Sequence, residues 1–138
     1  MTESVQGEFI LTNNPVVMNR CNGTIAVNGD AIDVFNRVVL YLEEGYELVT
    51  HPLAGSVRLA CNPYRSLLVR STGSKKVDRR GITAVLDSIV RVRKAMEERP
   101  VDFSLQEDYA VMDYEFVAQS AGNLCSPTRE GSAERVES

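Results

Sequence analysis

The apolar residues of the first half of the chain form short runs and helically spaced sets, and turn-forming residues separate them. Short apolar runs bounded by Asn, Gly or Pro are typical of strands. They predict strands over residues 9–12, 24–27, 46–50 and 66–69, with a short extended piece at 57–59.

The sequence predicts three helices, two of them from helical spacing of apolar residues. Asp30 is a suitable N-cap for one that ends before Gly45, because its side chain can accept bonds from the free amides of the first turn. A longer helix covers about residues 78–98, and Pro100 ends it. A short helix over residues 15–21 begins with proline, which suits the first helical position.

The last third of the chain gives a weaker pattern. Residues 108–117 alternate imperfectly between polar and apolar, and we expect a strand there rather than a helical turn. From Gly122 on, small, polar and charged residues dominate. We therefore expect one domain over residues 1–121, followed by a disordered charged tail over residues 122–138.

Strands that alternate with helices predict an α/β protein. We expect a three-layer, Rossmann-like domain with a mostly parallel sheet and helices on both faces. The turn at 13–15, the loop at 51–56 and the polar loop at 71–76 each follow an expected strand. Parallel strands would place all three at one edge of the sheet, where such proteins bind ligands.

Polar side chains are concentrated in these loops and just before the fourth expected strand. His51 is the only histidine of the chain, and Pro52 holds its backbone extended. Arg65 has the planar donor group that suits a carboxylate or a phosphate. These residues predict a small polar or anion-binding site formed by Asn13, Asn14, His51, Gly55, Ser56, Asn62, Tyr64, Arg65 and Ser66.

Each of these residues also has a structural interpretation. His51 can bond a backbone carbonyl, Gly55 can simply permit a positive φ, and Arg65 can pair with a nearby glutamate. Asn13 and Asn14 fit ordinary turn chemistry before a proline. The sequence leaves both interpretations open.

Charge is unevenly distributed along a chain of net charge −4. Residues 75–98 carry seven Lys and Arg against four Asp and Glu, and residues 99–138 carry three against eight. The basic helix could attract the acidic segment or an anionic ligand, although two solvated faces explain the same pattern. The net charge argues against nucleic acid as a partner.

Cysteine use and the apolar runs predict a soluble cytoplasmic protein. Cys21, Cys61 and Cys125 are sparse and odd in number, which suits a reducing compartment, and with one histidine they predict no zinc site. We expect no signal peptide, because no basic region precedes an apolar run, and no membrane span, because no apolar stretch approaches about 20 residues. We expect no cofactor, because no dinucleotide or P-loop pattern is present.

Three stretches of the chain resemble the GrdX family: the turn TNNP at 12–15, GYELVTHPLAGS at 45–56 and NPYRSLLV at 62–69. The resemblance covers about residues 8–70, with a weaker echo at 108–116, and HPLAGS is its most specific part. The family consists of small bacterial proteins associated with the glycine, sarcosine and betaine reductase systems of amino-acid-fermenting anaerobes. The resemblance thus implies a pathway context without a mechanism.

We expect a non-catalytic accessory protein of such a reductase system, with a site for a small anionic metabolite at the carboxyl edge of the sheet. One alternative is an enzyme that uses His51 as acid or base. Against it, the sequence contains no second histidine and no nucleophile motif. Another is a module that assembles a reductase complex through protein partners. The oligomeric state, a homodimer included, stays open.

Overall fold

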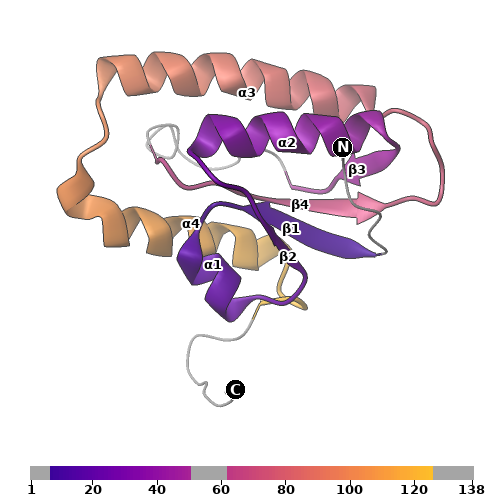
Figure 1. Ribbon diagram of the computed structural model, residues 1–138, viewed down its shortest axis with the longest axis horizontal. Helices are drawn as coiled ribbons and strands as arrows, with labels where there is room; N and C mark the ends of the chain where they lie inside the picture. The colour runs from indigo at the N-terminus through magenta and orange to yellow at the C-terminus, as the bar shows by residue number, and fades with distance from the viewer. Residues whose placement is uncertain (1–6, 51–61, 126–138) are drawn as a thin grey trace.

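A computed structural model describes residues 7–50 and 62–125 (Figure 1). These residues form a four-stranded sheet in the order β2-β1-β4-β3. Its strands are β1 (Glu8–Thr12), β2 (Thr24–Ala26), β3 (Tyr46–Leu48) and β4 (Ser66–Ser71). The strands lie where the short apolar runs predicted them, while the extended piece expected at 57–59 is outside the described residues.

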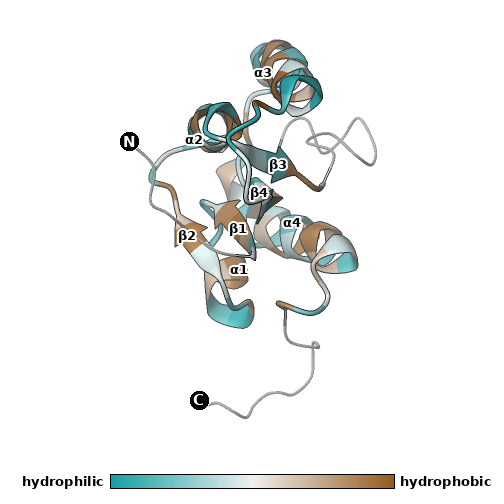
Figure 2. Ribbon diagram, turned by 90° about the vertical axis from the view of Figure 1, so that its right-hand side faces the viewer, coloured by the Kyte–Doolittle hydropathy of each residue, from teal (hydrophilic) through white to brown (hydrophobic). Residues whose placement is uncertain are grey.

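Helices cover both faces of the sheet, which confirms the α/β class. Figure 2 shows α2 and α3 on one face and α1 and α4 on the other. The helices are α1 (Pro15–Arg20), α2 (Ala31–Glu43), α3 (Arg79–Glu98) and α4 (Gln106–Ser120), with a short 3-10 helix η2 (Phe103–Leu105) before α4. Asp30 caps α2 as expected, accepting bonds from the amides of Ile32 and Asp33.

The sheet is mixed, so the expected mostly parallel, Rossmann-like sheet was wrong. Only β1 and β2 pair in parallel, and β4 is antiparallel to both of its neighbours. The helix α1 carries the chain from β1 to β2, as a parallel pair requires. The sequence pattern predicted no helix between the third and fourth expected strands, whereas neighbouring parallel strands need a crossover connection that is usually a helix. That feature of the pattern was the signal against a mostly parallel sheet.

Alternation along the strands divides the core between the two faces. Phe9 and Leu11 of β1 pack with α2 and α3, whereas Ile10 packs with α1 and α4. The same period of two places Leu67 of β4 in the first cluster and Leu68 in the second. Ser66 and Thr12 share the parity of Leu68 and Ile10, so they face α4.

Residues 108–117 belong to the helix α4, and the expected strand was wrong. The buried positions of this region follow the helical spacing i, i+3, i+4, i+7 and i+11 and form one helix face: Ala110, Asp113, Tyr114, Val117 and Ala121. An aspartate interrupts the apolar stripe, while the apolar residues at 111 and 112 are exposed. This mixture hides the helical period in the sequence.

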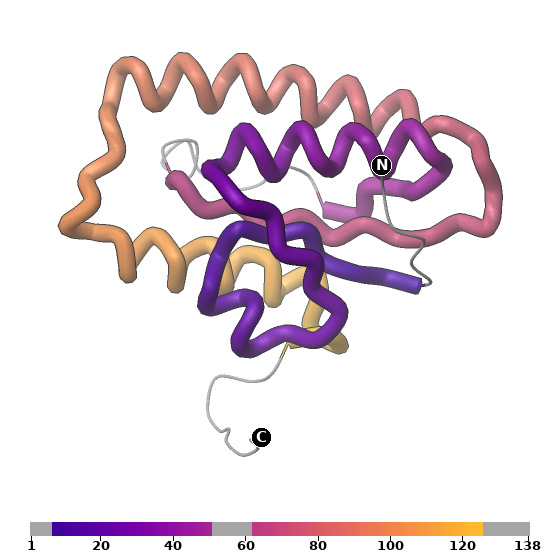
Figure 3. The backbone as a smooth tube through the Cα atoms, in the orientation of Figure 1, coloured from indigo at the N-terminus to yellow at the C-terminus, as the bar shows by residue number. Residues whose placement is uncertain are grey.

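The chain continues past α4 as an ordered turn. Cys125 forms a bridge and a disulfide with Cys21 at the end of α1, which the sparse cysteine count did not predict. Beside it, the amide of Asn22 donates to the carbonyl of Leu124, at 2.7 Å. The pairing fixes the C-terminal end of α4 against α1 (Figure 3). None of the helices in the described ranges is long and apolar enough to cross a membrane.

Candidate functional site

The antiparallel pairing of β1 with β4 brings two distant polar segments to one edge of the sheet. Thr12, the last residue of β1, is the register partner of Ser66, the first residue of β4. The segment after β1 and the segment before β4 therefore meet, at the end of the sheet where α4 begins in Figure 1. We call this region the polar edge: residues 12–14, residues 62–66 and Asp113 of α4.

Asp113 is the centre of the hydrogen bonds on the α4 side of the polar edge. Its Oδ2 accepts from the Ser66 hydroxyl at 2.7 Å and from the Asn14 amide Nδ2 at 2.9 Å. The Ser66 Oγ in turn lies 2.7 Å from the Thr12 Oγ1, which accepts from the backbone amide of Asn14. One carboxyl group thus connects α4 with β1, β4 and the start of α1.

Asp113 is 5% exposed, and this burial raises the pKa of its carboxyl above the ordinary value. The hydrogen bonds from Asn14 and Ser66 and the charge of Arg65 act in the opposite direction, because they favour the carboxylate. Burial is the larger effect. A buried ionisable group of this kind is more common at functional sites than in ordinary cores.

Asn14 and Asn13 use their side chains to hold the polar edge together. Asn14 caps α1 by accepting from Val16 N, and its Nδ2 donates to the Ala110 carbonyl. Asn13 Nδ2 donates to the carbonyls of Gly29 and Pro63, at 2.9 and 3.0 Å. The Asn13 Oδ1 accepts from the backbone amide of Arg65, at 2.9 Å. The helix cap of Asn14 is the local turn chemistry that the sequence suggested, whereas Asn13 instead connects backbone groups that are distant in sequence.

Asn62 and Tyr64 connect the segment before β4 with the start of α4. Asn62 Oδ1 accepts from Tyr64 N, and its Nδ2 donates to the carbonyl of Tyr109 at 2.8 Å. The Tyr64 hydroxyl accepts from Gln106 Nε2, also at 2.8 Å. These bonds fix the backbone that leads into Arg65 and Ser66.

Arg65 and Ser66 point to opposite faces of the sheet, since they are consecutive in an extended segment. The Arg65 guanidinium lies over the ring of Phe35 on α2, 5.7 Å from its centroid, and the residue is 4% exposed. Ser66 faces α4. The structure therefore places the arginine within the layer between the sheet and α2, and not beside the serine on one wall of a shallow pocket.

The structure brings together six predicted site residues: Asn13, Asn14, Asn62, Tyr64, Arg65 and Ser66. His51, Gly55 and Ser56 lie outside the described residues. The polar loop at 71–76 was expected at the same edge and lies at the opposite one, because β4 runs antiparallel to β1. Asp113 was missed, since its segment was interpreted as a strand. An acidic residue on the buried stripe of a helix is the signal that could have found it.

Metal-ligating side chains do not gather in the described ranges: no three His, Cys, Asp or Glu residues there could hold a metal ion together. The polar groups of the edge are instead amides, hydroxyls, one carboxyl and one guanidinium. This chemistry suits hydrogen bonding to an organic or inorganic anion better than metal coordination.

The fold and the polar edge define a small α/β protein with a mixed sheet and a buried polar network where β1 ends. Comparison with protein families then identifies it: residues 9–121 match the family model of the GrdX-like protein, and the chain belongs to this family. Comparisons with curated proteins and with solved structures found no match.

Proposed function

We propose that this chain is a non-catalytic accessory protein of an amino-acid reductase system, and that it binds a small anionic metabolite at the polar edge. Membership of the GrdX-like family supports the pathway, because the family is associated with glycine reductase systems. The placement of the site rests on the residues of the polar edge.

One observation carries the site: a buried guanidinium and a buried carboxyl, Arg65 and Asp113, are held at the same edge of the sheet. Burying ionisable groups costs free energy, and such groups are concentrated at functional sites as well as in structural networks. Asn13 fixes the backbone of Arg65 and Phe35 supports its side chain. A guanidinium has the planar donor geometry that binds a carboxylate or a phosphate with two parallel bonds.

His51, Gly55 and Ser56 belong to the proposal as further donors from the loop that follows β3. The imidazole would add a hydrogen bond, and the amide groups around Gly55 would face the anion. Their part in binding stays a prediction from the sequence. No observation on the described residues favours an acid–base reaction at His51 over simple binding.

Thermal and urea unfolding of the purified protein with candidate anions tests the binding site. Glycine, sarcosine, betaine, acetate, phosphate and acetyl phosphate are suitable probes. A ligand present at a hundred times its Kd should stabilise the protein by about 2.7 kcal/mol. The absence of stabilisation by every probe at millimolar concentration would contradict a site for small anions.

Variants locate the ligand within the molecule. Arg65→Lys keeps the charge and removes the planar fork, so the Kd should rise about tenfold or more, while circular dichroism stays unchanged. His51→Ala and Ser56→Ala should weaken binding in the same direction. Lys75→Gln removes an exposed charge from the loop after β4, at the end of the sheet opposite the polar edge, and should leave the Kd unchanged. Equal affinity in Arg65→Lys would place the ligand elsewhere.

The accessory role needs a separate test, since binding alone does not define a pathway. The protein should co-purify with components of a reductase complex from cells that ferment amino acids. Its purified form should not turn over esters, phosphates or reductase intermediates. A protein that always elutes alone at physiological salt, or one that shows turnover abolished by His51→Ala, would contradict the accessory role.

A further inference from the structure

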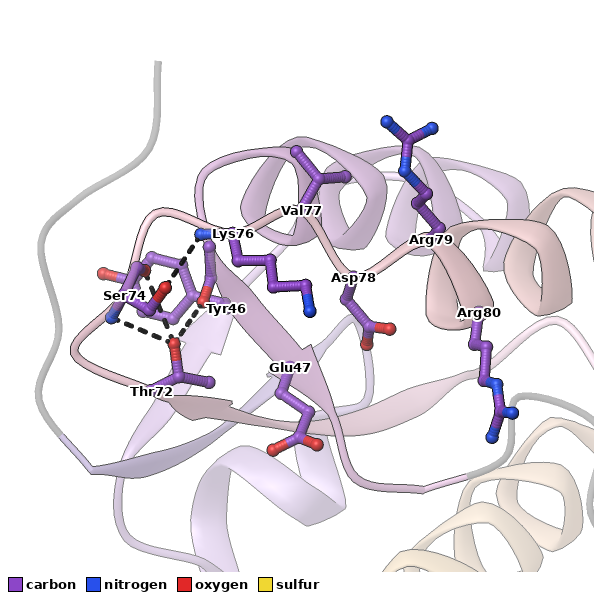
Figure 4. A pocket seen from close by; sticks show the side chains of 10 residues that line it. Tyr46, Glu47, Thr72, Ser74, Lys76, Val77, Asp78, Arg79 and Arg80 are labelled. Atoms are coloured by element: carbon purple, nitrogen blue, oxygen red, sulfur yellow. Dashed lines mark hydrogen bonds between the residues drawn. The ribbon is translucent and has the colours of Figure 1, made fainter.

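A hollow of about 620 Å³ lies beside the edge strand β3, at the end of β4 opposite the polar edge (Figure 4). It is formed by β3, the loop that follows β4 and the first turn of α3. We call it the basic hollow, and the lining side chains that matter most are Glu47, Thr72, Lys76, Asp78 and Arg80. Its volume is in the range of small-molecule sites.

Both carboxylates that line the basic hollow already have partners. Asp78 Oδ1 accepts from the amide of Gly81 at 3.0 Å, and Oδ2 accepts from the amide of Leu48 at 2.9 Å. Glu47 Oε1 accepts from Arg70 Nη2 at 2.7 Å and from Arg70 Nε at 3.2 Å. Their negative charges are therefore offset by two backbone N–H groups and by a neighbouring guanidinium.

The cations of the basic hollow form no ion pair among the described residues. Within residues 7–50 and 62–125, no carboxylate lies within ion-pair distance of Lys76, Arg79 or Arg80. Figure 4 shows the side chains of Lys76 and Arg80 extending on either side of Asp78, while Arg79 points away. Two cations thus face the hollow from separate segments, one from the loop and one from the helix.

We propose that the basic hollow is a binding site for a small molecule that carries a phosphate group. A phosphate group has the charge and the acceptor oxygens that suit the ammonium of Lys76 and the guanidinium of Arg80. A monocarboxylate has less charge. The hollow is also larger than a phosphate ion, so an organic part of the ligand would occupy the remaining space.

The side chains, and not the start of the helix, provide recognition in this proposal. The amide of Gly81 already donates to Asp78, and the amide of Arg79 donates to the carbonyl of Val77. Because both proposed ligand groups are solvent-exposed, the affinity should be modest and should fall with added salt. The site is independent of the polar edge, which lies at the other end of β4.

Isothermal titration with pyrophosphate as the probe tests the basic hollow, with acetate as the monovalent comparison. The double variant Lys76→Gln/Arg80→Gln should raise the Kd for pyrophosphate about tenfold or more. The matched control Arg93→Gln/Lys94→Gln removes the same charge from exposed positions of α3 about 20 Å from Arg80. It should change the Kd less than twofold. Both double variants alter exposed side chains, so the melting temperature should stay within about two degrees.

Binding of pyrophosphate to the wild type with Kd below about 1 mM, lost in the first double variant and kept in the second, supports the site. No binding at 10 mM would overturn it. Equal losses in both double variants would also overturn it, because the effect would then come from the overall charge of α3. The variant Arg65→Lys separates this site from the polar edge: a loss of pyrophosphate binding there, with the Lys76→Gln/Arg80→Gln protein unaffected, would assign the anion to the polar edge instead.

Discussion

The hydroxyl of Ser66 on β4 donates a 2.7 Å hydrogen bond to the carboxyl of Asp113 on α4, across 47 positions of sequence. Both residues are buried, so the bond fixes the last helix of the domain to the centre of the sheet. Its consequences for stability follow from the rule that a buried acceptor without its donor costs more than the bond itself contributes.

Removing this donor should destabilise the protein by about 1–3 kcal/mol. In Ser66→Ala, the side-chain amide of Asn14 is the remaining donor to Asp113. Urea unfolding followed by circular dichroism measures the change. The control is Ser71→Ala at the other end of β4, whose hydroxyl makes no hydrogen bond within the described residues. Equal stability of the two variants would show that the Ser66–Asp113 bond contributes nothing.

The raised pKa of Asp113 predicts an unusual pH dependence of stability. The folded protein holds the proton of this carboxyl more tightly than the unfolded chain, whose pKa is near 3.9. The contribution to stability is therefore full below about pH 4 and is lost as pH rises through the folded pKa, by at most about 1.4 kcal/mol per pH unit.

Asp113→Asn should remove this pH-dependent loss, because the amide stays neutral throughout. The free energy of unfolding, measured in urea from pH 3.5 to 8, should show the variant gaining on the wild type as pH rises. Glu115→Gln, an exposed acid on the same helix, is the control and should follow the wild type. A difference between wild type and Asp113→Asn that is constant or opposite in sign would contradict the assignment.

The Cys21–Cys125 disulfide closes a loop of 104 residues, so its loss should reduce stability by about 2–5 kcal/mol. The measurement is thermal unfolding with and without a phosphine reductant, in a Cys61→Ser background that leaves no third thiol. The melting temperature should fall on reduction. The triple variant that also carries Cys21→Ser and Cys125→Ser should melt at the lower temperature and ignore the reductant. A reductant-insensitive parent would show that the disulfide does not form in solution.

Substitutions at Gly45 and Gly73 distinguish the cost of a positive φ from the cost of a steric clash. Gly45 and Gly73 both have positive φ, 104° and 74°, which costs any other residue about 1 kcal/mol. A Cβ on Gly45 would collide with the backbone carbonyl oxygen of Ser74, whereas one on Gly73 meets nothing within 4 Å. Gly45→Ala should therefore be more destabilising than Gly73→Ala by urea unfolding. Equal losses would mean that the loop moves aside at no cost.

Much of the fold was predictable because local signals decide it. The N-cap Asp30 and the spaced apolar residues after it define α2, and the capping box is present as a local interaction. The helix α4 was not predictable in the same way. Its buried face includes Asp113, which only a partner such as Ser66 makes tolerable, and that partner is distant in sequence.

The candidate site was likewise predictable only in part. The predicted site included residues 13–14 and 62–66, and the structure brings these two segments together, although through antiparallel and not parallel strands. It could not tell that Asn13 and Asn14 use their amides within the chain, nor that Arg65 lies over Phe35 on the other face from Ser66. Those outcomes depend on strand direction and on side-chain parity within the assembled sheet.

The amino-acid sequence by itself determined the α/β class, the bounds of most elements and the family, because these depend on periodicity, capping residues and local strings of residues. Only the tertiary structure decided that β4 runs against β1, that Asp113 is the centre of the polar edge, and that Cys21 meets Cys125. The physical reason is that strand direction and pairing depend on the total free energy of packing two faces at once, and no single segment of the chain contains that information.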